Sequence, residues 1–311
     1  MRVLLTGATG FVGSHVLDRL VARGDQVRVL ALPETVEQLR HRDGVSIVAG
    51  SLADRDLLAG AARGVEVVYH LGGLLPGHPP EEIRIVNTLG TENLLYGCVR
   101  GRVRRLVFSS SASVYDESSW PLTGPITEQS PLRADGHGPI GPYAQSKIEA
   151  EKLIRRVHRR DGLEYVILRA PVVYGSGTRL DRQVLMQIIN RPHLSSTPGA
   201  RVANMQWINI SDMADAVVLA GTRPEAANQI FNIAGEELFS LRDLTRMVWA
   251  ILLNKPWADA LASQLRAVHH QHLKYDVSEA RRLLGYTSRV KLREGVEELV
   301  ARVGSGSPTG V

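Results

Sequence analysis

Short β-branched runs alternate with helical segments over the first two thirds of the chain. The apolar runs predict six strands, over Val3–Thr6, Val27–Leu32, Val45–Ala49, Val65–Leu71, Arg105–Ser109 and Glu164–Arg169. Helical periodicity between them predicts four helices, over Phe11–Arg23, Asp54–Ala62, Glu82–Val99 and Tyr143–Arg160. This alternation predicts an α/β fold, a Rossmann-like doubly wound parallel sheet with right-handed crossovers. Ligands of such sheets bind at the carboxyl ends of the strands.

The pattern becomes irregular after about Val172. It predicts a strand over Gln206–Ile210 and a helix that starts at Ser211. Further helices are predicted over Leu241–Leu253, Asp276–Leu284 and Leu292–Val303. We therefore expect a parallel-sheet domain, residues 1–171, and a smaller C-terminal α/β lobe, residues 172–303, which can interleave with it. The Gly- and Ser-rich residues 304–311 are typical of a disordered tail.

Composition narrows the functional class. The net charge is +5, but the basic residues are dispersed and aromatic residues are only 5% of the chain, which disfavours a nucleic-acid surface and suits an anionic cofactor or substrate. Cys98 is the single cysteine, so no disulfide forms within the chain, and we predict a cytoplasmic protein. No signal peptide is expected, and no apolar run approaches the ~20 residues that a membrane span needs.

A glycine-rich loop follows the first predicted strand and opens the first predicted helix. Its glycines, Gly7, Gly10 and Gly13, are spaced Gly-x-x-Gly-x-x-Gly. Glycines at such a place make the turn and let the backbone approach a pyrophosphate, while the helix N-terminus offers free N–H groups and a favourable dipole. The loop therefore predicts a dinucleotide site.

Tyr143 and Lys147 are four residues apart at the start of a predicted helix, so they share one helix face. An ammonium group beside a phenol lowers the pKa of the phenol below about 10. The pair is therefore a candidate for proton exchange near neutral pH. A serine cluster, Ser109, Ser110 and Ser111, lies upstream.

Together, the glycine loop, the serine cluster and the tyrosine–lysine pair resemble the extended short-chain dehydrogenase/reductases, the NAD(P)-dependent epimerase/dehydratase family. The resemblance runs nearly the whole length of the chain. Further segments similar to family motifs are His70–Gly73, Asn87–Leu94, Phe108–Tyr115, Leu168–Gly175, Trp207–Asp212, Asp276–Ala280 and Leu284–Tyr286.

The resemblance implies hydride transfer at a carbon that bears oxygen. Tyr143 would be the general acid/base, Lys147 would lower the tyrosine pKa and hold the nicotinamide ribose, and Ser111 would bond the substrate oxygen. Ser110 would be structural. The residues implied to contact the cofactor are Gly7, Gly10, Phe11, Val12, Gly13, Ser51, Leu52, Leu71, Gly72, Gly73, Asn87, Ser109, Tyr143, Lys147 and Pro171.

The choice between NAD and NADP stays open. Family members that use NAD carry an acidic residue at the end of the second strand, and NADP users carry an arginine nearby. Here Ala31 and Leu32 occupy these positions. Glu34, Arg40 and Arg42 are close in sequence but out of register.

The resemblance leaves the reaction open between two enzymes. Dehydratases of the family place an Asp-Glu pair where this chain has Ala112 and Ser113, so dehydration is disfavoured. Nucleotide-sugar epimerases hold the diphosphate with an asparagine and an arginine where this chain has Val172 and Met205. Arg201 and Arg266 are the residues that could compensate. We therefore predict a ketoreductase or alcohol dehydrogenase for a small or medium-sized molecule. The alternative is an epimerase with tightly bound NAD.

A non-catalytic NAD(P)-binding sensor ranks low, because such proteins commonly lose the tyrosine or the lysine. His269, His270 and His272 lie close together in the sequence, but no further metal-binding residues accompany them, so no metal site is predicted. The resemblance also implies a homodimer, paired through the helices over Glu82–Val99 and Tyr143–Arg160.

Overall fold

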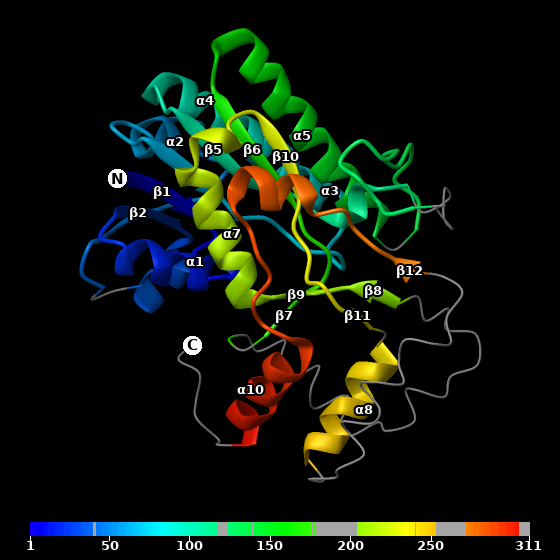
Figure 1. Cartoon of the computed structure of the whole chain (residues 1–311). Helices are drawn as coiled ribbons and strands as arrows, with labels where there is room; N and C mark the ends of the chain where they lie inside the picture. Colours follow the sequence, from blue (N-terminus) through cyan, green and yellow to red (C-terminus); the bar gives the residue numbers. More distant parts are fainter. Residues whose placement is uncertain are drawn as a thin grey trace.

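A parallel sheet of seven strands forms the centre of the computed structural model (Figure 1). The structure describes residues 1–39, 42–116, 124–138, 140–175, 177, 204–239, 241–252 and 272–304. The strands are β1 (Arg2–Thr6), β2 (Gln26–Ala31), β3 (Val45–Ala49), β4 (Val67–His70), β5 (Arg105–Ser109), β6 (Glu164–Arg169) and β10 (Gln229–Asn232). Their order is β10-β6-β5-β4-β1-β2-β3, and every neighbouring pair is parallel. The predicted Rossmann-like α/β fold is confirmed.

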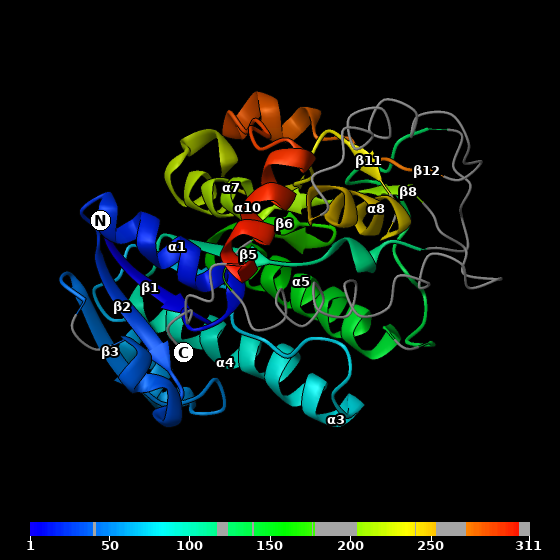
Figure 2. The same cartoon turned by 90° about the horizontal axis from the view of Figure 1, so that it is seen from below.

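Helices cover both faces of the sheet (Figure 2). One face carries α1 (Phe11–Ala22) and α7 (Ile210–Thr222), whose apolar side chains share a core with β1, β2 and β4. The other face carries α2 (Arg55–Ala61), α4 (Gly90–Gly101) and α5 (Gly141–Asp161), which enclose a second core. Because both faces are covered, the strands read as nearly continuous apolar runs.

Local signals in the sequence explain several helix ends. The Asp54 side chain caps α2 by accepting a hydrogen bond of 2.9 Å from the Leu57 amide. Gly162 ends α5 with a φ of +74°, a conformation that costs glycine little. Short 3₁₀ helices connect other elements, over Pro33–Leu39, Ala112–Val114 and Pro224–Ala226.

The predicted helix over Glu82–Val99 is divided in three. It consists of α3 (Pro80–Ile83), a π-helical turn (Arg84–Leu89) and α4. The wider turn contains Asn87, whose side chain is bonded to Leu74 and Ser146. π-Turns of this kind are common at functional sites.

The smaller lobe lies beyond the carboxyl ends of the strands (Figure 1). It contains a two-stranded sheet, β7 (Val173–Tyr174) with β9 (Ile208–Asn209), and a three-stranded sheet of β8 (Asn204–Gln206), β11 (Leu238–Phe239) and β12 (His272–Leu273). Its helices are α8 (Leu241–Leu252) and α10 (Leu292–Gly304), and a π-helical turn spans Ala280–Leu284.

The chain crosses between the two parts more than once. The predicted strand over Gln206–Ile210 is two strands, and α7 begins at its last residue. Both α7 and β10 return to the large sheet, so the division at residue 171 stays a proposal with an interleaved second part. The predicted tail lies almost wholly outside the described residues. Within the described ranges, no helix is long and apolar enough to cross a membrane.

Candidate active site

The glycine loop is a tight turn between β1 and α1. Gly10 donates its amide to the Gly7 carbonyl over 3.0 Å, and Gly7 has a φ of +76°. A Cβ atom on Gly13 would lie 1.9 Å from that same carbonyl oxygen, and one on Gly7 would lie 2.6 Å from the amide nitrogen of Gly72. The backbone is therefore as close as glycine allows, and the first turn of α1 is left with free N–H groups for an anion.

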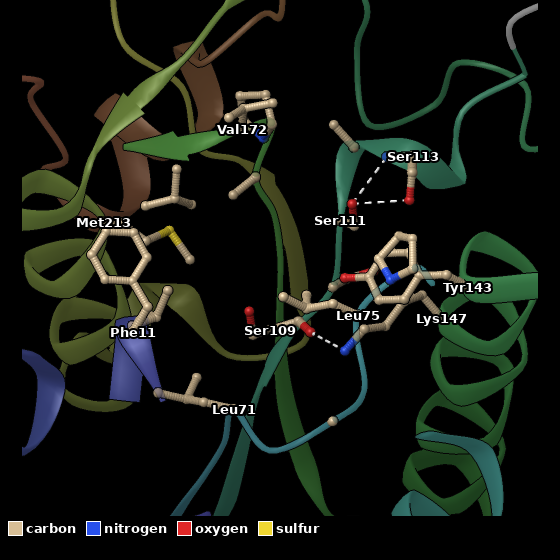
Figure 3. Close-up of a pocket in the computed structure, with 18 of the residues that line it drawn as sticks. Phe11, Leu71, Leu75, Ser109, Ser111, Ser113, Tyr143, Lys147, Val172 and Met213 are labelled. Carbon is tan, nitrogen blue, oxygen red and sulfur yellow. Dashed lines mark hydrogen bonds between the residues drawn. The ribbon is translucent and has the colours of Figure 1, made fainter. Parts of the chain in front are cut away.

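A cavity of about 700 Å³ extends from this loop to α5 (Figure 3). It lies where the loops after β1, β4, β5 and β6 meet, as the sheet topology predicts. Its lining includes most of the predicted site residues: Gly7, Gly10, Phe11, Val12, Gly13, Leu71, Gly73, Ser109, Ser111, Tyr143, Lys147 and Pro171.

Four predicted cofactor contacts are not in the cavity lining. Gly72 packs on the glycine loop and donates to the Thr6 hydroxyl over 3.1 Å. The side chain of Asn87 accepts from the Leu74 amide over 2.7 Å. The other two, Ser51 and Leu52, follow β3.

The catalytic candidates meet at one wall of the cavity, opposite Phe11 and Met213 (Figure 3). Tyr143 and Lys147 come from the first turns of α5, and Ser111 follows β5. The Ser111 oxygen accepts hydrogen bonds from the hydroxyl of Ser113 over 2.9 Å and from its amide over 3.1 Å.

Burial governs the two titratable groups. It raises the pKa of Tyr143 to about 12, and the hydrogen bond with Ser111 offsets part of the rise. The expected lowering by Lys147 is not found, because the ammonium group donates to the Ser109 carbonyl over 2.9 Å and stays 5.8 Å from the centre of the tyrosine ring. Burial lowers the pKa of Lys147 to about 8, against an opposing effect of Glu151.

A buried ion pair supports the catalytic wall. Glu151, one turn after Lys147, bonds Arg169 of β6 through both carboxylate oxygens, at 2.6 and 3.0 Å, and both side chains are buried. Ser110 donates to the same carboxylate over 2.6 Å, which agrees with its predicted structural role. Sequence reasoning missed this pair, because its only signal was the spacing of Glu151 from Lys147.

His70 connects the end of β1, just before the glycine loop, to the first turn of α4. One ring nitrogen is hydrogen-bonded to the Thr6 hydroxyl at 2.8 Å and the other to the Thr91 hydroxyl at 3.0 Å. Burial, with a smaller effect of Lys147, lowers the pKa of His70 to about 3. The ring is therefore neutral at physiological pH, and its two hydrogen bonds hold β1 and α4 together.

The two positions that distinguish NAD from NADP at the end of β2 carry uncharged side chains. Ala31 is buried, and Leu32 is 46% exposed. Arg42 pairs with Asp18 at 2.5 Å, and Arg40 lies outside the described residues. The glycine turn and the elongated cavity fit a dinucleotide, but neither Ala31 nor Leu32 distinguishes NAD from NADP. The described part of the chain holds no cluster of three or more His, Cys, Asp or Glu side chains that could bind a metal, and His269 and His270 lie outside it.

Comparison with known proteins gives consistent matches over most of the chain. A family model described as the NAD dependent epimerase/dehydratase family matches residues 3–234. A UDP-glucose 4-epimerase of Vibrio cholerae is 28% identical, over 95% of this chain and 93% of the relative. A 2-alkyl-3-oxoalkanoate reductase of Stenotrophomonas maltophilia is 25% identical, over 97% and 99%. The crystal structure of a Thermus thermophilus UDP-glucose 4-epimerase in complex with NAD has a TM-score of 0.79 at 26% identity, over 99% of this chain and 100% of that one.

Proposed function

The chain belongs to the NAD dependent epimerase/dehydratase family, and we propose that it is an NAD(P)-dependent ketoreductase or alcohol dehydrogenase. It is an enzyme of the extended short-chain dehydrogenase/reductase type. The reaction would be hydride transfer at a secondary alcohol or ketone carbon. One observation carries the choice of a substrate without a diphosphate. Among the described residues that line the cavity, the only charged side chain is Lys147, at the catalytic wall.

The residues present suit a nicotinamide dinucleotide, which when bound supplies or accepts the hydride. The backbone N–H groups of the glycine loop would hold the pyrophosphate. Ser109 and Pro171 line the stretch of cavity between this loop and the catalytic wall, where the nicotinamide ribose would lie, and Lys147 would bond that ribose.

Tyr143 would move the proton. In ketone reduction its hydroxyl gives a proton to the substrate oxygen, and in alcohol oxidation its phenolate takes one. Ser111 would donate to the same oxygen and stabilise developing negative charge. The Lys147 ammonium, with a pKa of about 8, is mostly charged at neutral pH, and its hydrogen bond to the Ser109 carbonyl directs it away from the Tyr143 hydroxyl and towards the place proposed for the ribose.

Epimerisation is the second candidate, since the same residues can oxidise an alcohol and reduce the ketone from its other face. The Vibrio cholerae relative favours it. It is disfavoured at the cavity, because Val172 and Met205 offer a diphosphate neither an amide nor a guanidinium group. Arg201 and Arg266 lie outside the described residues. A non-catalytic NAD(P) sensor ranks below both, since Tyr143 and Lys147 are both present and adjacent to the cavity.

Cofactor stoichiometry separates the candidates. The purified enzyme is incubated with a ketone panel and NADH or NADPH, and separately with UDP-glucose and no added cofactor. A reductase consumes about one reduced nucleotide for each ketone reduced, whereas an epimerase converts UDP-glucose with only the nucleotide that copurifies. UDP-glucose epimerisation without ketone reduction would reject the reductase assignment.

Quaternary structure and location remain proposals. We propose a homodimer in which α4 and α5, neighbours on one outer face, pair with their copies (Figure 2). Sedimentation at micromolar concentration that shows only monomer would refute it. The cytoplasmic location is supported by the single cysteine, Cys98, which is buried.

A further inference from the structure

We propose that the substrate is an apolar ketone or alcohol, with a hydrocarbon chain or ring that packs against Leu75, Val172, Met205 and Leu273. This inference rests on the proposed function and adds the chemical class of the substrate. It concerns the apolar lining of the cavity around the catalytic wall, where Leu75 lies beside Tyr143 and Val172 lies farther away, next to the smaller lobe (Figure 3).

The described wall of the cavity is mostly apolar on the substrate side. On the substrate side its described lining is Leu75, Pro76, Ala112, Ser113, Ile140, Val172, Val173, Met205, Leu273 and Tyr275. Its hydroxyl groups are those of Ser113 and Tyr275. Ser113 already donates to Ser111, so it belongs to the oxygen end of the site. A site with polar groups at one point and hydrocarbon elsewhere orients a substrate by its oxygen and binds the rest by exclusion of water.

Exposure of apolar side chains carries the second argument. Leu75 is 59% exposed and Val172 is 45% exposed. Only four large hydrophobic side chains are this exposed in the described ranges, and these two line the same cavity. Exposed apolar groups that gather at one concave place mark a binding site, whereas scattered single ones do not. An apolar ligand would cover both.

The apolar wall from the smaller lobe is held in place. Met205 of β8 pairs in register with Leu273 of β12, so their side chains lie on the same side of the three-stranded sheet. The buried Gln206 bonds the Tyr275 amide over 2.6 Å and the Gly235 carbonyl over 2.7 Å. These bonds fix β8 against the chain after β12, so the wall is a preformed surface.

The test uses unbranched methyl ketones, namely 2-butanone, 2-hexanone, 2-octanone and 2-decanone, with dihydroxyacetone and UDP-glucose as polar probes. Burial of one methylene group contributes about 0.8 kcal/mol, so kcat/KM should rise about three- to fourfold for each methylene that enters the cavity. Dihydroxyacetone should be reduced no faster than 2-butanone. Calorimetric binding of 2-decanol should show a negative heat-capacity change, which reports apolar burial without turnover.

A matched pair of variants tests whether the hydrocarbon chain of the ketone contacts Val172. Val172→Asn adds a polar amide to the wall and should lower kcat/KM for 2-decanone about fivefold or more, with less than about twofold change for 2-butanone. Ile85→Asn is the control, because Ile85 is 43% exposed but lies outside the cavity lining. It should leave the chain-length dependence unchanged.

The outcomes separate this inference from the proposed function. Ketone reduction with no chain-length dependence, or with dihydroxyacetone preferred, would overturn the apolar substrate and leave the reductase intact. Equal effects of the two variants would also overturn it, because the wall would then not contact the chain. Epimerisation of UDP-glucose with no reduction of any ketone would reject both.

Discussion

Replacement of Lys147 by methionine should stabilise the protein while it removes activity. Lys147 is 6% exposed, and burial lowers its pKa from 10.5 to about 8. This difference corresponds to about 3 kcal/mol of unfavourable free energy for the charged form in the folded state at pH 7. Loss of the hydrogen bond to the Ser109 carbonyl costs about 1 kcal/mol. Methionine fills similar space, so Lys147→Met should raise the free energy of unfolding by about 2 kcal/mol at pH 7.

The stability difference between the wild type and Lys147→Met should depend on pH. Because the folded pKa lies below the unfolded one, the unfolded chain binds the proton more strongly between pH 8 and pH 10.5. The free energy of unfolding of the wild type therefore rises over this range relative to the variant. The advantage of Lys147→Met should be full below pH 8 and fall to zero at pH ~10, where the remaining penalty on the lysine equals the ~1 kcal/mol of the lost hydrogen bond.

Urea denaturation at pH 7 and pH 10 measures both quantities. Lys152→Met is the control, since Lys152 lies on the same helix and is exposed. It should change stability little at either pH. A Lys147→Met protein that is less stable than the wild type at pH 7, or whose difference does not depend on pH, would refute the reasoning.

Three further predictions follow from the same contacts. Tyr143→Phe should reduce turnover at least about a thousandfold while the dissociation constant for nucleotide, measured by calorimetry, changes less than about threefold; wild-type turnover would contradict the proton-transfer role. Arg169→Met leaves a buried carboxylate unpaired and should lower the free energy of unfolding by about 3–5 kcal/mol, whereas Arg282→Met, at an exposed pair, should leave the urea midpoint unchanged within error. Gly13→Ala places a methyl group 1.9 Å from a backbone oxygen and should abolish nucleotide binding in equilibrium dialysis. The control, Gly60→Ala, meets nothing within 4 Å and should bind nucleotide normally. Normal binding by Gly13→Ala would exclude the tight turn.

The sequence predicted the elements with strong local signals and missed those fixed by tertiary contacts. Six of the seven strands of the large sheet were predicted from apolar runs. β10 was missed because it is only four residues long and its two apolar residues, Ile230 and Phe231, are flanked by polar ones. It is a strand because β6 supplies its hydrogen-bond partners.

The site shows the same limit. The spacing of Tyr143 and Lys147 and the serine cluster predicted which side chains would meet, but not the direction of the Lys147 ammonium. That direction depends on the Ser109 carbonyl at the end of β5, which no local pattern reveals. The prediction of a lowered tyrosine pKa was wrong for the same reason, because burial of Tyr143 outweighs a lysine that bonds elsewhere.

The late position of β10 in the chain has a consequence for synthesis. Until this strand leaves the ribosome, β6 remains an open sheet edge. Nascent chains expose such edges and apolar faces to aggregation or to chaperones. Val172 and Met205, which line the cavity, lie between β6 and β10 in the chain. Substitutions that change the substrate preference therefore fall in the segment that separates β6 from its partner strand, and they also affect how much enzyme reaches the folded state.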